Sequence, residues 1–529
     1  MNILKDKLRQ NREQLTVLLF SAAVSLIFLS FFSKNSFFYP LNNGADINMF
    51  YTMGKGIANG LVCYRDIFDQ KGPIWYFLYT IAYFLDRNGY WGIFLIEIIS
   101  FTFFLYFTYK AMKLYGGEKF FYFTAPILAF CTMGNGSFWQ GGQAEELIFP
   151  LLAYLLYSLL RYFKEDYPEK PMDYKTLLIN GICSGLVFWS KFTLIMPWFI
   201  FMAGVFIIMI SRKHVKRAFI SCLVFLGGTL IPTVPVFIYF IANGAVGDLV
   251  QVYFIENIFG YSPTVQSDES TLETLWKNVK LGIDRIGPSM VLALFGGVGL
   301  LFAKKRYLPD WRTKLIFPIM FLASVLGIYG GGTSYMYYPA ALIPYALLGA
   351  AVLGDVMNEG WKYIPEKAKP KTIFAVAVAA SMIISFAATF DGNRNIHILF
   401  EKKEDTVQYR FAETINSVPG STMINYGFLD HGFYMAADKL PVTKYFARIN
   451  LKYEALPEMY EAQRDVVKNG EADFVVLKIS KDYTLDYIEK IYGSLFDDYI
   501  VVDDMIYYNG DSKWESHYIL LAHESVDLY

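Results

Sequence analysis

Long apolar stretches recur along the first 390 residues of the chain, with short polar segments between them. A membrane core of about 30 Å is crossed by roughly 20 apolar residues in a helix. We therefore predict eleven spans, of which the shorter ones must tilt or thin the bilayer. In chain order they cover 15–33, 91–109, 120–136, 147–163, 176–190, 192–210, 218–241, 286–303, 315–330, 337–357 and 373–390.

The apolar segment from Pro73 to Asp86 is not one of these spans. Its 14 residues are too few to cross and favour a helix lying in the membrane interface. The basic loops then fall on the same side as the basic N-terminus, which the positive-inside rule places in the cytoplasm. No small-residue cleavage site follows the first span, so we expect a retained anchor. The basic loops cover 110–119, 161–175, 212–217, 304–314 and 362–371.

This arrangement places the remainder of the chain outside the cell. Residues 391–529 alternate helix-like patterns at 411–418, 453–468 and 485–493 with the β-rich runs ADFVVLK, YIVVDDMIYY and HYILLAH. We predict an all-α polytopic membrane domain over 1–390, with a first outer loop over 34–90 and interfacial helices, followed by a small extracytoplasmic α/β domain over 391–529.

Composition narrows the function classes. Hydrophobic residues make up 55% of the chain and charged residues only 18%, against about a quarter charged in soluble domains. The net charge of -1 leaves no basic excess for a nucleic-acid partner. Four cysteines without a CxxC pair support neither a disulfide framework nor a structural zinc site. The five histidines lie outside the predicted spans, which argues against a His-based triad or zinc cluster in the membrane core.

The first outer loop is rich in candidate chemistry. Asp46 begins an amphipathic helix that should end near Gly60, and Arg65, Asp69 and Lys71 follow before a Gly–Pro break. A carboxylate held at the membrane rim can act as a general base on an acceptor hydroxyl. Lysine and arginine nearby can hold a phosphate. The alternative is that Asp46 merely caps a helix and that the other charges form a solvated loop.

Three further outer segments carry candidate binding residues. Gln143 and Glu145 precede a predicted span, where a carboxylate either complements the helix dipole or binds sugar hydroxyls or a cation. Lys191 lies within a long apolar region, and an ionisable residue there is a functional candidate unless it snorkels from the hairpin turn. Tyr335 and Tyr338 follow a glycine run, and the alternative for them is an interfacial aromatic belt.

These segments together resemble a known family. Asp46 followed by YRDIFDQKGP, and then by QAEELIFPLLAYLLY, GLVFWSKFTLIMP, IANGAVGDLVQVYFIENIFGY and GGTSYMYYPAALIPYALL, is similar to the polyprenyl-phosphate-sugar-dependent GT-C glycosyltransferases. The nearest group is the bacterial branch of the protein mannosyltransferase and lipid A aminoarabinose transferase family. The resemblance runs in order across residues 40–355.

The resemblance implies an inverting glycosyltransferase of a bacterial plasma membrane. It would move a sugar from a polyprenyl-phosphate donor to a hydroxyl of a glycan, lipid or protein on the outer face. Asp46 would be the general base, Lys71 would contact the donor phosphate, and Glu145 and Lys191 would match the second acidic position and the hairpin lysine. The other substrate-binding candidates are Arg65, Asp69, Gln143, Tyr335 and Tyr338.

The likeness has one departure, and it leaves some questions open. Ile47 stands where many relatives carry a second acidic residue, so the resemblance does not extend to a carboxylate pair there. Neither the sugar nor the need for a divalent cation follows from the sequence. One alternative function is a lipid-linked saccharide flippase or transporter, which predicts mid-bilayer polar groups and inverted repeats. Another is a ligand sensor, which would leave the Asp46–Lys71 cluster without a role.

Overall fold

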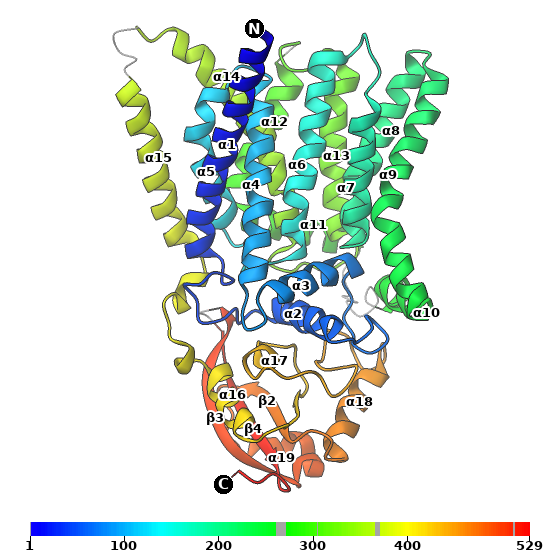
Figure 1. The fold of residues 1–529 in the computed structure, drawn as a ribbon, viewed down its shortest axis with the longest axis vertical. Coiled ribbons are helices and arrows are strands. Elements are labelled where there is room, and N and C mark those ends of the chain that lie inside the picture. Colours follow the sequence, from blue (N-terminus) through cyan, green and yellow to red (C-terminus); the bar gives the residue numbers. More distant parts are fainter. Residues whose placement is uncertain (1, 261–270, 304, 366–370, 512–513, 529) are drawn as a thin grey trace.

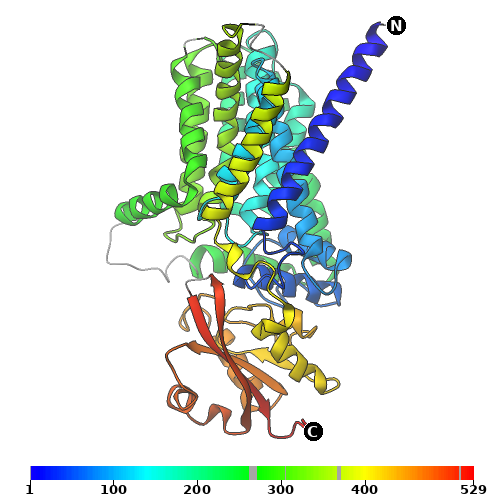
Figure 2. The ribbon, with the colours of Figure 1, turned by 90° about the vertical axis from the view of Figure 1, so that its left-hand side faces the viewer.

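A bundle of long helices carries a smaller α/β domain at one end (Figure 1 and Figure 2). The computed structural model describes residues 2–260, 271–303, 305–365, 371–511 and 514–528. Each predicted span corresponds to one bundle helix. These are α1 (Asn2–Phe32), α4 (Trp91–Lys113), α5 (Phe121–Met133), α6 (Ala144–Arg161), α7 (Tyr174–Phe188), α8 (Met196–Ser211), α9 (Val215–Ala242), α12 (Pro288–Phe302), α13 (Trp311–Tyr329), α14 (Ala346–Lys362) and α15 (Lys371–Gly392).

The bundle helices differ in how well they match a bilayer. Within the described ranges, eight helices are long and apolar enough to cross a membrane, or up to nine if a bent pair counts as one span. That pair is α12 with α11 (Thr271–Ile286), which meet at 103°. Helices α5 and α7 are shorter, at 13 and 15 residues. The prediction of a multi-pass helical membrane fold is confirmed.

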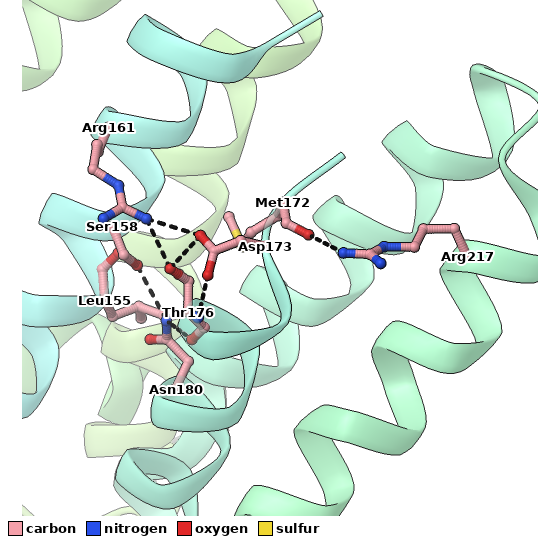
Figure 3. Close-up of polar contacts among 8 residues, drawn as sticks. All are labelled: Leu155, Ser158, Arg161, Met172, Asp173, Thr176, Asn180 and Arg217. Atoms are coloured by element: carbon pink, nitrogen blue, oxygen red, sulfur yellow. Dashed lines mark hydrogen bonds and ion pairs between the residues drawn. The ribbon is translucent and has the colours of Figure 1, made fainter. Parts of the chain in front are cut away.

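The start of α7 lies at the bundle end that carries the N-terminus (Figure 1) and is fixed by polar contacts (Figure 3). Asp173 caps the helix by accepting a hydrogen bond from the Thr176 backbone N–H at 2.8 Å. Arg161 of α6 binds the Asp173 carboxylate at 2.9 Å, and Asn180 donates to Ser158 Oγ at 3.1 Å. These contacts hold α7 against α6, and the opposite end of α7 leads into the Lys191 turn.

Two helices of the first outer loop lie across the other end of the bundle. They are α2 (Ala45–Ala58) and α3 (Pro73–Leu85), and Figure 1 shows both between the bundle and the C-terminal domain. Gly60, with a φ of +95°, follows the last turn of α2, as predicted for a helix stop. The segment after Pro73 therefore forms a short apolar helix across the end of the bundle. Further elements at this end are α10 (Val246–Leu249) and the π-helical η4 (Val250–Gly260).

The C-terminal domain contains a four-stranded sheet of order β1-β2-β4-β3. Strand β1 (Met423–Asn425) is parallel to β2 (Phe474–Ser480), whereas β4 (Trp514–His523) is antiparallel to both β2 and β3 (Tyr499–Asp511). The helices are α16 (Val407–Ser417), α17 (Phe433–Ala436), α18 (Pro457–Lys468) and α19 (Tyr487–Tyr492). The predicted α/β character is confirmed.

The domain and the first outer loop share one apolar core. Buried side chains of α2 and α3, such as Phe50 and Tyr79, belong to the same cluster as Phe433 and Tyr518 of the C-terminal domain. The amphipathic pattern of α2 predicts one exposed face, but Thr52 and Lys55 on its other side are buried as well. The C-terminal domain covers that face.

Candidate active site

A cavity of about 1090 Å³, its open mouth included, lies where the loops at one end of the bundle meet the C-terminal domain. Asp46, Asp69, Lys71, Lys191, Tyr335 and Tyr338 line it, although they come from three separate segments of the chain. The structure therefore brings together six of the nine residues that the sequence singled out. Leu429, Ile449 and Asn450 of the C-terminal domain complete the wall.

Backbone pairing places the Lys71 and Lys191 segments side by side. The Gly72 N–H donates to the Ser190 carbonyl at 2.9 Å, and the Ile74 N–H donates to the Trp189 carbonyl at 3.1 Å. A Cβ atom at Gly72 would overlap the Trp189 carbonyl oxygen. The glycine after Lys71 is thus required by the close approach of the two chains rather than by its φ of −70°.

Asp46 lies in the first turn of α2, half-buried, and faces the cavity. Its Oδ2 atom is buried and has no hydrogen-bond partner within the described part of the chain. A buried acceptor without a donor is costly, so a ligand hydroxyl arriving there gains a full hydrogen bond.

Lys71 presents a cation to the same cavity. Its Nζ lies 5.8 Å from the Phe50 ring centroid, and among the described residues no ion-pair partner contacts it. Burial alone would lower the pKa of Lys71, but the charges of Asp46, Tyr338 and Asp69 raise that pKa above its usual value. The ammonium therefore stays charged and can receive an anion.

Lys191 is already paired. Its Nζ forms an ion pair with Glu145 in the first turn of α6, and it lies 3.7 Å from the Tyr338 ring centroid. The Glu145 side chain is 1% exposed and that of Lys191 14%. Glu145 thus lies behind Lys191 rather than on the cavity surface. The second oxygen of its carboxylate, Oε2, has no hydrogen-bond partner among the described residues.

Asp69 lines the cavity but is held by its own loop. The Tyr76 hydroxyl donates to Asp69 at 2.8 Å and accepts from the Lys71 backbone N–H at 2.7 Å. Burial raises the pKa of the Asp69 carboxyl above its usual value. Asp69 is therefore placed to fix the loop that carries Lys71.

Two predicted site residues lie elsewhere. Arg65 is exposed, donates to both oxygens of Asp66 at 2.8 and 2.9 Å, and donates to the Asn243 carbonyl at 2.8 Å. Gln143 is the N-cap residue of α6 and is 1% exposed, and no described residue partners its side-chain amide. Neither side chain reaches the cavity surface.

The cavity also contains residues that sequence reasoning missed. Asn257 of η4 donates from Nδ2 to the Gln70 carbonyl at 2.9 Å and so fastens η4 beside Lys71. Asn450 donates to the Tyr335 hydroxyl at 3.4 Å across the cavity mouth. Neither carries a local signal, because an isolated asparagine in a polar segment is ordinary. Over the described ranges, no group of three or more His, Cys, Asp and Glu could hold a metal ion.

Solved structures share this architecture. ArnT from Cupriavidus metallidurans bound to undecaprenyl phosphate is similar with a TM-score of 0.62 and 13% identity, over 97% of this chain and 98% of that one. ArnT in the apo state gives 0.57 and 12%, over 96% and 97%. Arabinofuranosyltransferase AftD from Mycobacteria gives 0.46 and 11%, over 97% of this chain and 40% of that one. The likeness to ArnT shows that this chain has the GT-C fold, as predicted.

Comparisons of sequence identify the protein family of the chain. A search of curated proteins finds no match. The family model described as "Putative competence-induced protein Ccs4 N-terminal domain" matches residues 5–365, which include the first outer loop and all but the last bundle helix. The chain belongs to this competence-induced Ccs4 family.

Proposed function

We propose that this protein is an inverting membrane glycosyltransferase that moves a sugar from a polyprenyl-phosphate donor to an acceptor hydroxyl at the outer face of the membrane. The observation that carries the proposal is the pairing of opposite charges in one cavity. Asp46 offers a buried carboxylate oxygen without a partner, and Lys71 offers a charged ammonium without an ion-pair partner in the described part of the chain.

Each group has a role in a single displacement. Asp46 takes the proton from the acceptor hydroxyl as its oxygen forms a bond to the anomeric carbon. The bond between that carbon and the phosphate oxygen breaks, and its electron pair leaves with the polyprenyl phosphate. Lys71 stabilises the charge that develops on the phosphate. Attack opposite the leaving group inverts the anomeric carbon.

The surroundings of the cavity suit a lipid donor. It lies at the end of an apolar bundle, so a polyprenyl tail can remain among helices while its phosphate reaches Lys71. The GT-C fold is also that of ArnT, which has been solved with undecaprenyl phosphate bound. The Tyr337 and Tyr338 rings offer apolar faces for a sugar.

Two substitutions separate the proposed roles. Purified protein is given a panel of undecaprenyl-phosphate sugars, and release of undecaprenyl phosphate is measured. Asp46→Asn should lower turnover by about 10²- to 10⁴-fold, because a general base contributes that much. Its thermal stabilisation by undecaprenyl phosphate should remain, since Lys71 is intact. Lys71→Ala should lose both the stabilisation and the turnover.

Controls are available at the same end of the bundle. Asp284→Asn removes an exposed carboxylate of α11, and Arg65→Ala removes a cation that points away from the cavity. Both should behave as the unsubstituted protein does. Full turnover in Asp46→Asn, or unchanged lipid binding in Lys71→Ala, would show that this cavity is not the site of transfer.

A further inference from the structure

Helix α2, which carries Asp46, is held between two bodies (Figure 1). On the bundle side Gly54 packs directly on α3, where an added Cβ would lie 2.6 Å from the Tyr79 carbonyl carbon and 2.8 Å from the Thr80 nitrogen. On the opposite side it meets the C-terminal domain at α17 and the loop before it. The position of Asp46 therefore depends on both contacts.

The contact with the C-terminal domain includes a fully buried hydrogen bond. Thr52 Oγ1 donates to Asp430 Oδ2 at 2.8 Å, and both residues are 0% exposed. The other oxygen of Asp430 accepts from Asn425 Nδ2 at 3.0 Å and from the Gly432 N–H at 2.9 Å. Asp430 thus couples α2 to strand β1 and to the loop that leads into α17.

An ion pair lies one turn further along α2. Lys55 Nζ contacts Asp438 Oδ1 at 2.6 Å and the Tyr434 carbonyl at 3.4 Å. The Lys55 side chain is 3% exposed, whereas that of Asp438 is 66% exposed. A buried ammonium needs a partner, and the C-terminal domain supplies all the partners found for Lys55 among the described residues.

The loop before α17, which contacts α2, also lines the cavity. Leu429, which precedes Asp430, lines the cavity wall with Ile449 and Asn450. Gly432 approaches α2 closely, because a Cβ there would lie 3.3 Å from Asn48 Oδ1. A shift of this loop would therefore move the cavity wall and α2 together.

We propose that Asp430 is a positioning residue for transfer, and that the C-terminal domain sets the place of Asp46 through the Thr52–Asp430 hydrogen bond, with Lys55–Asp438 as a second support. This inference rests on the proposed function. Asp46 and Thr52 are six residues apart, roughly 9 Å along one helix. A small tilt of α2 moves the carboxylate away from an acceptor oxygen while leaving Lys71 on its separate loop.

A merely structural anchor would behave differently from a positioning contact. Loss of an anchor lowers the melting temperature and the yield but leaves kcat per folded molecule unchanged. Loss of a positioning contact lowers kcat while the donor KM and undecaprenyl-phosphate binding stay the same, because the donor phosphate is held by Lys71. A loss of kcat per folded molecule at unchanged donor KM therefore indicates positioning, and a lower melting temperature at unchanged kcat indicates an anchor.

The experiment uses the full-length protein and the undecaprenyl-phosphate sugar that it consumes. Thr52→Val removes the hydroxyl and keeps the shape, and it should lower kcat by about 10- to 100-fold, as a misplacement near 1 Å does. Thr52→Ser keeps the donor and should restore kcat. Thr108→Val removes a buried hydroxyl that donates to the Phe104 carbonyl of its own helix, α4, at 2.9 Å, and should leave kcat unchanged.

Asp438→Asn provides a second route, because it removes the charge of the largely exposed partner while the amide oxygen can still accept from the buried Lys55. It should lower kcat several-fold with the donor KM unchanged. Unsubstituted kcat in both Thr52→Val and Asp438→Asn, with Asp46→Asn inactive, would overturn the positioning role alone. Equal kcat losses in Thr52→Val and Thr52→Ser would overturn it too. No turnover in the unsubstituted protein, or full turnover in Asp46→Asn, would overturn the proposed function and this inference with it.

Discussion

At the scale of single residues, the ion pair between Glu145 and Lys191 can be tested for its contribution to stability. Removing one partner of a buried ion pair typically costs about 3–5 kcal/mol, whereas replacing both is close to neutral. Lys191→Met should therefore lower the melting temperature markedly, because the Glu145 carboxylate is 1% exposed and would lose its cation. The double variant with Glu145→Gln should recover most of the loss.

Thermal unfolding of the two single variants and the double variant measures this coupling as a cycle. A matched control is Lys481→Met, which breaks an ion pair with Glu515 on the surface of the C-terminal domain and should change little. Additive losses in the double variant would mean that Glu145 and Lys191 do not depend on each other in the folded protein.

Sequence reasoning found the residues of this site whose chemistry has a local signal. Asp46 begins a helix, Lys71 precedes a Gly–Pro break, and Lys191 interrupts an apolar stretch, and all three line the cavity. It placed Arg65 with them only because Arg65 is near in sequence. In the fold Arg65 turns to its neighbour Asp66, and no pattern of residue types reveals which way an exposed side chain turns.

At the scale of elements, the backbone pairing of the Lys71 and Lys191 segments can be tested at Gly72. Alanine is compatible with the backbone at that position, where φ is −70°, but its Cβ would overlap the Trp189 carbonyl oxygen. Overpacking of this kind costs about 1–3 kcal/mol and must separate the two segments. Gly72→Ala should weaken undecaprenyl-phosphate binding by about tenfold, or about 1.4 kcal/mol.

Gly60→Ala is the counterpart in the same loop. Gly60 has a φ of +95° and open space around it, so alanine there is strained without touching a neighbour. It should cost about 1–2 kcal/mol of stability and leave lipid binding unchanged. Thermal unfolding and lipid titration of both variants distinguish the two effects. Equal lipid affinity in the two variants would indicate that the backbone pairing of the two segments does not position Lys71.

The elements themselves were largely predictable from hydrophobic patterning. Each predicted span has its helix, and the segment after Pro73 forms the short apolar helix α3. Length alone does not separate α3 from the bundle helices, because α5 also has 13 residues, but α3 lies across the end of the bundle. The burial of both faces of α2 was not predictable. An amphipathic pattern identifies the apolar face, but polar residues such as Thr52 and Lys55 are buried only because Asp430 and Asp438 meet them.

At the scale of the whole molecule, the C-terminal domain is part of the candidate site rather than an appendage. It shares a continuous apolar core with α2 and α3 and contributes Leu429, Ile449 and Asn450 to the cavity. Such contacts join segments far apart in the chain. Local sequence patterns predict the domain's helices and strands but contain no information on what they pack against, so its part in the site emerged only from the fold.

This architecture makes the sidedness of the molecule decisive, because the cavity must open where the acceptor is found. The N-terminus and the C-terminal domain lie at opposite ends of the bundle (Figure 1). Since the basic loops share the N-terminal end, we predict that this end is cytoplasmic.

A cysteine introduced as Glu454→Cys, on the exposed surface of the C-terminal domain, should react with a membrane-impermeant maleimide in intact cells. Lys305→Cys, in the exposed loop between α12 and α13, should react only after permeabilisation. The native protein is the control, because Cys63, Cys131 and Cys183 are buried and Cys222 is half-buried in α9. The opposite labelling pattern would place the cavity on the cytoplasmic side and require a cytoplasmic acceptor.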